Sequence, residues 1–195
     1  MSEFSATLEK VAKALENNSK RFEELDSAAG DGDLGITAGK IAEGMRSGIS
    51  LSTGDLKADL MMLGREISKS APSTFGTLFA TGFIRASGVV SNEYSPLENV
   101  QKGFKAAFEG IVARGKASIG ERTLLDALAP ALTALNDASD LRSGLSSAAI
   151  AARGGAKATA EMMPRHGRAG WIGERAKGLE DAGANVIAVV FEALQ

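Results

Sequence analysis

The sequence contains no cysteine and only one histidine, one tryptophan and one tyrosine among its 195 residues. The lack of cysteine excludes disulfides, thiolate catalysis and zinc–sulfur sites. A single histidine leaves few ligands for the softer transition metals. A strong charge imbalance is also lacking, because the net charge is −2 and the pI is near 5.6. This balance excludes the basic footprint that is typical of nucleic-acid-binding proteins.

Long apolar runs are lacking as well. No run approaches the roughly 20 residues that a membrane span needs, and the first residues have no basic and apolar regions of a secretory signal. The composition, with 44% hydrophobic and 24% charged residues, is typical of a folded globular protein. The length favours one domain covering residues 1–195. We therefore expect a cytoplasmic protein with neither a nucleic-acid nor a membrane partner, and the sequence leaves a homo-oligomer open.

Apolar residues recur with helical spacing along most of the chain, and no segment alternates as a strand would. One helix start is clear, because Ser95-Pro96-Leu97-Glu98 combines a capping serine, a proline in the first turn and a glutamate three residues on. The spacing predicts eight helices, at Ser2–Leu25, Asp33–Ile49, Asp55–Ser70, Ser73–Val90, Pro96–Arg114, Thr123–Asp137, Ser143–Met162 and Gly183–Leu194. The short connections imply antiparallel neighbours in an all-α fold. Gly154 and Gly155 are expected to let two helices approach closely.

One connection is long. Met163–Ala182, "MPRHGRAGWIGERAKGLEDA", is glycine-rich and basic, and loops of this length are usually functional or disordered. Its arginines (Arg165, Arg168 and Arg175) are compatible with neutralising phosphate or with a solvated loop, and Trp171 either pins the loop or flanks a base. His166 has no carboxylate partner evident in the sequence, which favours a surface residue over a catalyst.

The stretch "LDSAAGDGDLG" places Asp26, Asp31 and Asp33 within eight residues. One interpretation is a solvated turn with a helix cap. The other is a site for a hard cation such as magnesium or calcium, which prefers carboxylate oxygens. An EF-hand is a poor match, because the twelfth position counted from Asp31 is Ala42 and the closing glutamate is missing. Magnesium bound by few carboxylates usually completes its shell with water and phosphates, so a nucleotide is the first ligand expected.

Neither GxxxxGK[ST] nor a GxGxxG after a strand occurs in the sequence. A phosphate site would therefore use helix N-termini. The stretch "SKSAPSTFGT" offers one, because Pro72 marks a helix start surrounded by the hydroxyls of Ser70, Ser73 and Thr74. Taken alone, this stretch favours a simple capped helix over a phosphate site.

Four segments in order resemble the nucleotide-binding L subunit of dihydroxyacetone kinase, the DhaL family: "LDSAAGDGDLGIT", "SAPSTFGTLFA", "RGKASIGERTLLDALAPAL" and "GRAGWIGERAKGLEDAGA". The resemblance implies an antiparallel eight-helix barrel with a nucleotide site at one end. It implies that Asp26, Asp31 and Asp33 hold two Mg²⁺ ions on the phosphates of ADP or ATP and act in catalysis through the metal. The long loop becomes a lid. The nucleotide contacts it implies fall on Leu34, Gly35, Ile36, Thr37, Ser70, Ala71, Gly115, Leu124, Arg168, Asp181, Ala182 and Gly183.

Two positions depart from the family pattern. Leu34 stands where the family's GDGDHG motif has histidine. "SKSAPS" stands where the family usually reads GGASGP, so flexible glycines are lost and Pro72 removes a backbone donor. The hydroxyls of Ser70 and Ser73 are expected to compensate toward the nucleotide.

The resemblance also implies partners. In this family the L subunit passes phosphate to dihydroxyacetone or a related small ketose, which a separate K subunit binds covalently through its own histidine. The donor is ATP in one branch. In the other branch, ADP is recharged in place by the M subunit of a phosphotransferase system. Alternatives are a kinase subunit for another triose or tetrose, a non-catalytic nucleotide-binding regulator, and a plain helical scaffold. Retention of three mutually repelling carboxylates favours the enzyme.

Overall fold

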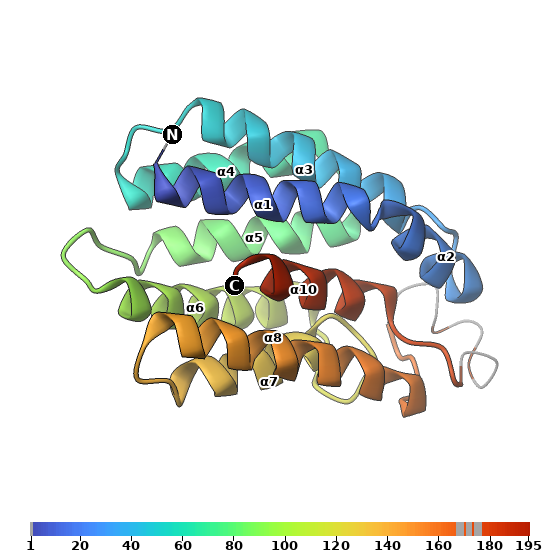
Figure 1. Ribbon diagram of the computed structural model, residues 1–195. Coiled ribbons are helices and arrows are strands. Elements are labelled where there is room, and N and C mark those ends of the chain that lie inside the picture. The colour runs from blue at the N-terminus through green and yellow to red at the C-terminus, as the bar shows by residue number, and fades with distance from the viewer. Residues whose placement is uncertain (1, 167–169, 171–172, 174–176) are drawn as a thin grey trace.

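The computed structural model describes residues 2–166, 170, 173 and 177–195, and its regular secondary structure in these ranges is helical (Figure 1). No strand occurs among the described residues, which confirms the expected all-α class. The helices are α1 (Glu3–Asn17), α2 (Ser19–Ala29), α3 (Leu34–Ser50), α4 (Leu56–Ser70), α5 (Thr74–Ser87), α6 (Pro96–Gly115), α7 (Leu125–Asn136), α8 (Leu141–Ala158), the 3₁₀ turn η1 (Thr159–Glu161) and α10 (Ala182–Ala193).

Eight of these helices form a closed ring. Going round it, α1 packs on α3, α3 on α4, α4 on α5, α5 on α6, α6 on α7, α7 on α8 and α8 on α10, and α10 returns to α1. The short α2 projects at one end of the ring and packs against α3 and α10 (Figure 1). The expected eight-helix barrel is therefore confirmed.

The apolar interior of the ring consists of two clusters of buried side chains. The first lies between α1, α2, α3, α4, α5 and one face of α10 and includes Phe22, Ile41 and Met45. The second lies between α6, α7, α8 and the other face of α10, is rich in alanine, and includes Phe191. Phe75, in the first turn of α5, packs against both clusters. The first turn of α5 thus joins the two halves of the interior.

Small residues bring α7 and α8 together. A Cβ added at Gly155 would lie 2.2 Å from the backbone oxygen of Asp126, so only glycine fits at this crossing. The expected close approach is confirmed for Gly155. Gly154 faces open space, because nothing lies within 4 Å of a Cβ placed there.

The first predicted helix, Ser2–Leu25, is wrong as a single element. The helix is interrupted at Asn18, whose φ and ψ are −101° and 3°. The next helix, α2, starts at Ser19 and continues to Ala29. Asn18 ends α1 with its own side chain, because its Nδ2 donates to the carbonyl oxygen of Ala14 at 2.8 Å. After this break α2 projects at one end of the barrel (Figure 1), and Asp26 is part of α2.

Other helix ends follow their caps. The start of α6 is as predicted, because Ser95 and Glu98 form a complete capping box ahead of Pro96. The predicted Ser143–Met162 helix starts earlier, at Leu141, where the side chain of Asp140 accepts from the amide of Ser143, and its α-helical part ends at Ala158. Nowhere in the described part of the chain is a helix both long and apolar enough to cross a bilayer.

Candidate metal centre and the helix ends around it

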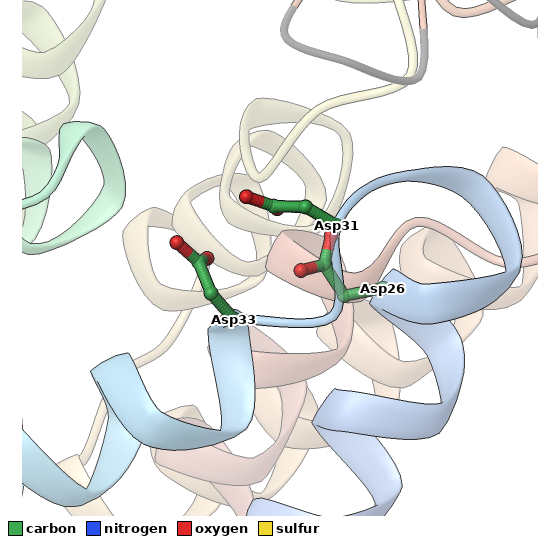
Figure 2. A group of neighbouring side chains, drawn as sticks. All are labelled: Asp26, Asp31 and Asp33. Atoms are coloured by element: carbon green, nitrogen blue, oxygen red, sulfur yellow. The ribbon is translucent and has the colours of Figure 1, made fainter.

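Three carboxylates meet at the junction of α2 and α3. Asp26 lies in the last turns of α2, Asp31 in the following turn, and Asp33 at the N-cap of α3. One carboxylate oxygen of each lies within 4.8 Å of the others, and Figure 2 shows the three side chains gathered around one space. Asp31 and Asp33 are exposed and Asp26 is half-buried. The sequence motif is therefore a cluster in space as well as along the chain.

Two glycines allow this turn to lie against α2. A Cβ at Gly30 would come within 2.6 Å of Oδ1 of Asp26. Gly32 has a φ of +75°, and a Cβ there would lie 2.3 Å from Oγ of Ser27. Residues with side chains at either position would push the turn away from α2. The glycines around the aspartates therefore bring the three carboxylates together.

The cluster carries negative charge that its own surroundings only partly offset. Burial raises the pKa of Asp26, the charges of Asp31 and Asp33 raise it further, and donation from the amide of Leu34 at 3.2 Å lowers it. Asp33 stands at the N-cap of α3, but its side chain makes no capping hydrogen bond. A divalent cation would relieve this repulsion, and the all-oxygen ligand set suits magnesium or calcium. The residues present fit such an ion.

The residues after the triad contribute through the backbone and through packing. The side chain of Leu34 is buried in the first core cluster, and its amide is the part that reaches Asp26. Gly35 is pressed against α2, because a Cβ there would lie 2.4 Å from the carbonyl oxygen of Ser19. Ile36 is 63% exposed beside the triad, and Thr37 is buried.

The start of α5 meets the start of α3. The Oγ1 of Thr37 donates to Oγ of Ser73 at 3.4 Å, and Oγ of Ser73 caps α5 by accepting from the amide of Gly76. Ala71 is buried immediately before this cap. Ser70 faces another way, because its Oγ donates to the carbonyl oxygen of Glu66 at 2.9 Å, beside Gly44 of α3. The Ser70 hydroxyl thus donates within the protein, whereas the Ser73 hydroxyl acts as an acceptor in both of these bonds.

The start of α10 reaches the same end of the barrel. Asp181 caps α10 by accepting from the amide of Ala184 at 2.7 Å, and Gly183 packs against the ring of Phe75. Burial raises the pKa of Asp181 to about 6, with smaller raising contributions from the charges of Asp126 and Asp26; the Ala184 amide and Arg122 act in the opposite direction. Asp181 therefore lies within electrostatic reach of the triad. Ala182, which lies between Asp181 and Gly183 in the sequence, is buried.

Gly115 and Leu124 flank the connection between α6 and α7. Gly115 packs against Leu78 of α5, and Leu124 is buried in the cluster that also contacts Leu78. The starts of α3, α5 and α10 thus lie at the same end of the barrel as the triad, and the α6–α7 connection contacts α5 through Leu78. Arg168, Trp171 and Arg175 lie outside the described residues.

The expectation that His166 has no carboxylate partner is wrong. Its Nε2 lies 2.5 Å from Oε2 of Glu121, and the amide of Arg165 donates to the carbonyl oxygen of Glu121 at 3.3 Å. The amide of Ser118 and then His166 hold the pKa of Glu121 below its ordinary value. Forty-five residues separate the pair, so local spacing carried no sign of it. Glu121 and its neighbour Arg122 are the residues near the site that the sequence did not single out.

Comparison with known proteins places this arrangement in a family. The DAK2 domain family matches residues 28–195. The chain is 31% identical over 188 residues to the ADP-binding subunit DhaL of PEP-dependent dihydroxyacetone kinase 1 of Listeria innocua, covering 96% of this chain and 91% of that protein. It is 30% identical over 179 residues to the corresponding DhaL subunit of Escherichia coli, covering 87% and 84%.

Longer proteins match as well. The L-erythrulose 1-kinase of Mycolicibacterium smegmatis is 31% identical over 97% of this chain, which spans 34% of that kinase. Crystal structures of the dihydroxyacetone kinase of C. freundii, in its native form and in complex with AMP-PNP and Mg²⁺, superpose with a TM-score of 0.78 at 26% identity. They cover 97% of this chain and 33% of that enzyme. The chain belongs to the DAK2 domain family, together with the DhaL subunits of dihydroxyacetone kinases.

Proposed function

We propose that this protein is the ADP- or ATP-binding, phosphoryl-transfer subunit of a dihydroxyacetone-type kinase. The observation that carries the proposal is the convergence of Asp26, Asp31 and Asp33 with the N-termini of α3, α5 and α10. Two relatives that match over most of their own length are named ADP-binding subunits of such kinases. A helix N-terminus favours phosphate through its free amides and its dipole, and a metal would allow phosphate to approach an acidic cluster.

Each part of the site has a distinct task in this proposal. Asp26, Asp31 and Asp33 supply oxygen ligands for magnesium, and we propose two ions, as the resemblance implies. Magnesium, when bound, offsets the charge of the phosphates. The turn at Gly30–Gly32 fixes the spacing of the ligands, and the first turns of α5 and α10 border the space for the nucleotide. Phosphoryl transfer depends mainly on positioning and electrostatics, which such a site provides without a protein nucleophile.

The acceptor is proposed to arrive on a second protein. His166, the sole histidine, is paired with Glu121, and among the described residues we find no group at the triad that would hold a ketose covalently. A K-type subunit would supply the small ketose. The donor would be ATP, or a phosphotransferase-system M-type subunit that recharges bound ADP. Another triose or a tetrose is the second candidate substrate, because relatives named erythrulose kinases match almost the whole chain.

The test is sugar-phosphate formation by the isolated chain, by a K-type partner alone and by the two together, with ATP or with the phosphotransferase chain as donor. We expect turnover only from the pair. We also expect Asp33→Asn to abolish it while the two proteins still bind each other. Robust sugar phosphorylation by the isolated chain would overturn the subunit assignment. A pair that binds Mg-nucleotide yet never transfers phosphate would instead be a non-catalytic regulator.

A further inference from the structure

Arg122, in the connection between α6 and α7, is one of the largest fully buried side chains, with 2% of its surface exposed. Its φ of +59° is unusual for a residue with a side chain. One terminal nitrogen, Nη2, donates to the carbonyl oxygen of Leu179 at 2.8 Å. Its Nε and Nη1 are buried and have no hydrogen-bond partner among the residues that the structure describes.

Such a residue is a poor choice for stability alone. Arginine is almost never fully buried unless it is paired, and buried donors without partners are unfavourable. Burial lowers the pKa of Arg122, and only the charge of Asp181 acts in the opposite direction. An apolar side chain of similar volume would avoid this penalty. The guanidinium therefore calls for an explanation other than the stability of the unliganded fold.

The hydrogen bond of Arg122 and its interaction with Asp181 both lead to the segment at the start of α10. Leu179 stands two residues before Asp181, the N-cap of α10, and the charge of Asp181 faces Arg122. From the other side, the amide of Asp181 donates to Oγ1 of Thr159 at 2.7 Å, and the amide of Gly178 donates to the carbonyl oxygen of Ala160. Arg122 is thus the part of the α6–α7 connection that holds residues 178–181 in place.

The same α6–α7 connection also contacts the start of the long loop, at Arg165 and His166. Glu121, next to Arg122, binds the amide of Arg165 and the ring of His166. The connection is itself fixed by Asp126, which accepts from the amides of Gly120 and Thr123 at 2.5 and 2.7 Å. Arg122 therefore projects from a rigid support. A rigid support is what a positioning residue needs.

We propose that Arg122 is a positioning residue for nucleotide binding, which holds residues 179–183 at the start of α10 in register with the Asp26, Asp31 and Asp33 cluster. It acts through the Leu179 carbonyl and the charge of Asp181, without touching the nucleotide. The inference rests on the proposed function, because it assigns Asp181–Gly183 to the nucleotide site. Arg122 is not among the nucleotide contacts that the resemblance implies.

The experiment compares Arg122→Met, Arg122→Lys and Arg46→Met in the full chain. Arg46 is a matched control, because it binds Glu9 and Glu16 and lies about 18 Å along α3 from the triad end, at 1.5 Å per residue. Three quantities are measured: Mg-ADP affinity by calorimetry, Mn²⁺ affinity without nucleotide, and hydrogen exchange of the amides of residues 178–184. Exchange is read without ligand, so it reports positioning even if Mg-ADP does not bind.

We expect Arg122→Met to weaken Mg-ADP binding by roughly tenfold or more, the size expected for one lost hydrogen bond to a charged group. Exchange at residues 178–184 should rise, whereas Mn²⁺ affinity and the melting temperature should change little. Arg122→Lys should recover part of the affinity, and Arg46→Met should change neither affinity nor exchange in that segment. Unchanged exchange in Arg122→Met, or raised exchange with unchanged Mg-ADP affinity, would overturn the proposal. Wild-type protein that does not bind Mg-ADP would overturn the proposed function, while the exchange data would still decide whether Arg122 positions the segment.

Discussion

Each end of α3 is flanked by a turn that contains a glycine with positive φ and a carboxylate from a neighbouring helix. The pKa values of the two carboxylates are shifted in opposite directions. The turn before α3 has Gly32 with a φ of +75° and a carboxylate from α2, Asp26. The turn after α3 has Gly54 with a φ of +84° and a carboxylate from α4, Asp59. Asp59 accepts from Oγ of Ser52, from the amide and hydroxyl of Thr53, and from the amide of Gly54, at 2.5 to 3.2 Å.

The difference lies in where each carboxylate finds its partners. Burial acts to raise the pKa of Asp59, but the donors on Ser52, Thr53 and Gly54 hold it below its ordinary value. The pKa of Asp26 is raised by burial and by the charges of Asp31 and Asp33. The charge of Asp59 is therefore stabilised by hydrogen bonds from within the protein, and these bonds fix the turn after α3. The carboxylate of Asp26 instead lies beside two further carboxylates, whose charges raise its pKa.

The largest effect that separates the two ends is expected from Asp33→Asn. The change removes one ligating charge from the triad and preserves the shape of the side chain. We expect the affinity for Mg-ADP to fall at least ~100-fold, which corresponds to about 3 kcal/mol, and Asp31→Asn to act in the same way. The unliganded chain should stay equally stable or gain stability, because repulsion is relieved. Calorimetry and thermal melting measure the two quantities, and unchanged affinity in both variants would refute the metal assignment.

Asp59→Asn is expected to act on the other end with the opposite result. The amides of Thr53 and Gly54 would then face a group with only one acceptor oxygen, and we expect a loss of about 2 kcal/mol in the free energy of unfolding. Affinity for Mg-ADP should stay the same in protein that is folded. Urea unfolding and calorimetry provide the two measurements. A loss of affinity comparable to that of Asp33→Asn would show that the two ends are not independent.

The two glycines offer a closely matched pair of smaller changes. Alanine at Gly54 would be strained by the positive φ, at about 1 kcal/mol, but no atom lies within 4 Å of its Cβ. Alanine at Gly32 would bear the same strain and would also meet Oγ of Ser27. Gly54→Ala should therefore lower stability without changing Mg-ADP affinity, whereas Gly32→Ala should lower both. Equal affinities in the two variants would contradict the role given to the Gly32 turn.

The smallest expected effect is in the pH dependence of stability without metal. The pKa of Asp26 is above the ordinary 3.8, so the stability linked to its protonated form is lost as the pH rises from about 3.8 through the raised pKa. The pKa of Asp59 is below 3.8, so its contribution is present above that pH and is lost as the pH falls through the lowered pKa. Relative to wild type, Asp26→Asn should gain stability with rising pH and Asp59→Asn should lose it. Urea midpoints between pH 3 and 6 test whether the two differences have opposite signs.

The sequence predicted what local spacing controls. The capping box at Ser95–Glu98 sets a helix end through neighbouring residues, and the three aspartates are brought together by a turn of their own glycines. The break at Asn18 was missed because the apolar stripe of Leu15 and Phe22 continues across it. The run Asn17-Asn18-Ser19 was the available signal, since these residues are poor in helix interiors and common at caps.

Contacts between residues far apart in the sequence could not be predicted from local residue spacing. The pairing of Glu121 with His166 and the hydrogen bond from Arg122 to Leu179 join residues 45 and 57 positions apart. Full burial of Arg122 runs against the preference of arginine for the surface, so composition pointed away from it. The hydroxyls of Ser70 and Ser73 suggested a phosphate site, and spacing did not reveal that Ser70 donates to Glu66 or that Ser73 accepts from Gly76. The sequence predicted the grouping of the three aspartates better than it predicted the long-range contacts around them.

Closure of the ring by α10 against α1 has a consequence for folding order. The helices that complete the ring come from opposite ends of the described chain, and such contacts form late because a long loop must close first. The charge of Asp26 acts on Asp181 at the start of α10, so we expect the site to be complete only when the ring is closed. Partly folded chains, with the ring still open, should therefore lack affinity for nucleotide. Nucleotide would then bind only chains whose ring is closed. By binding them it would stabilise the folded state over partly folded states.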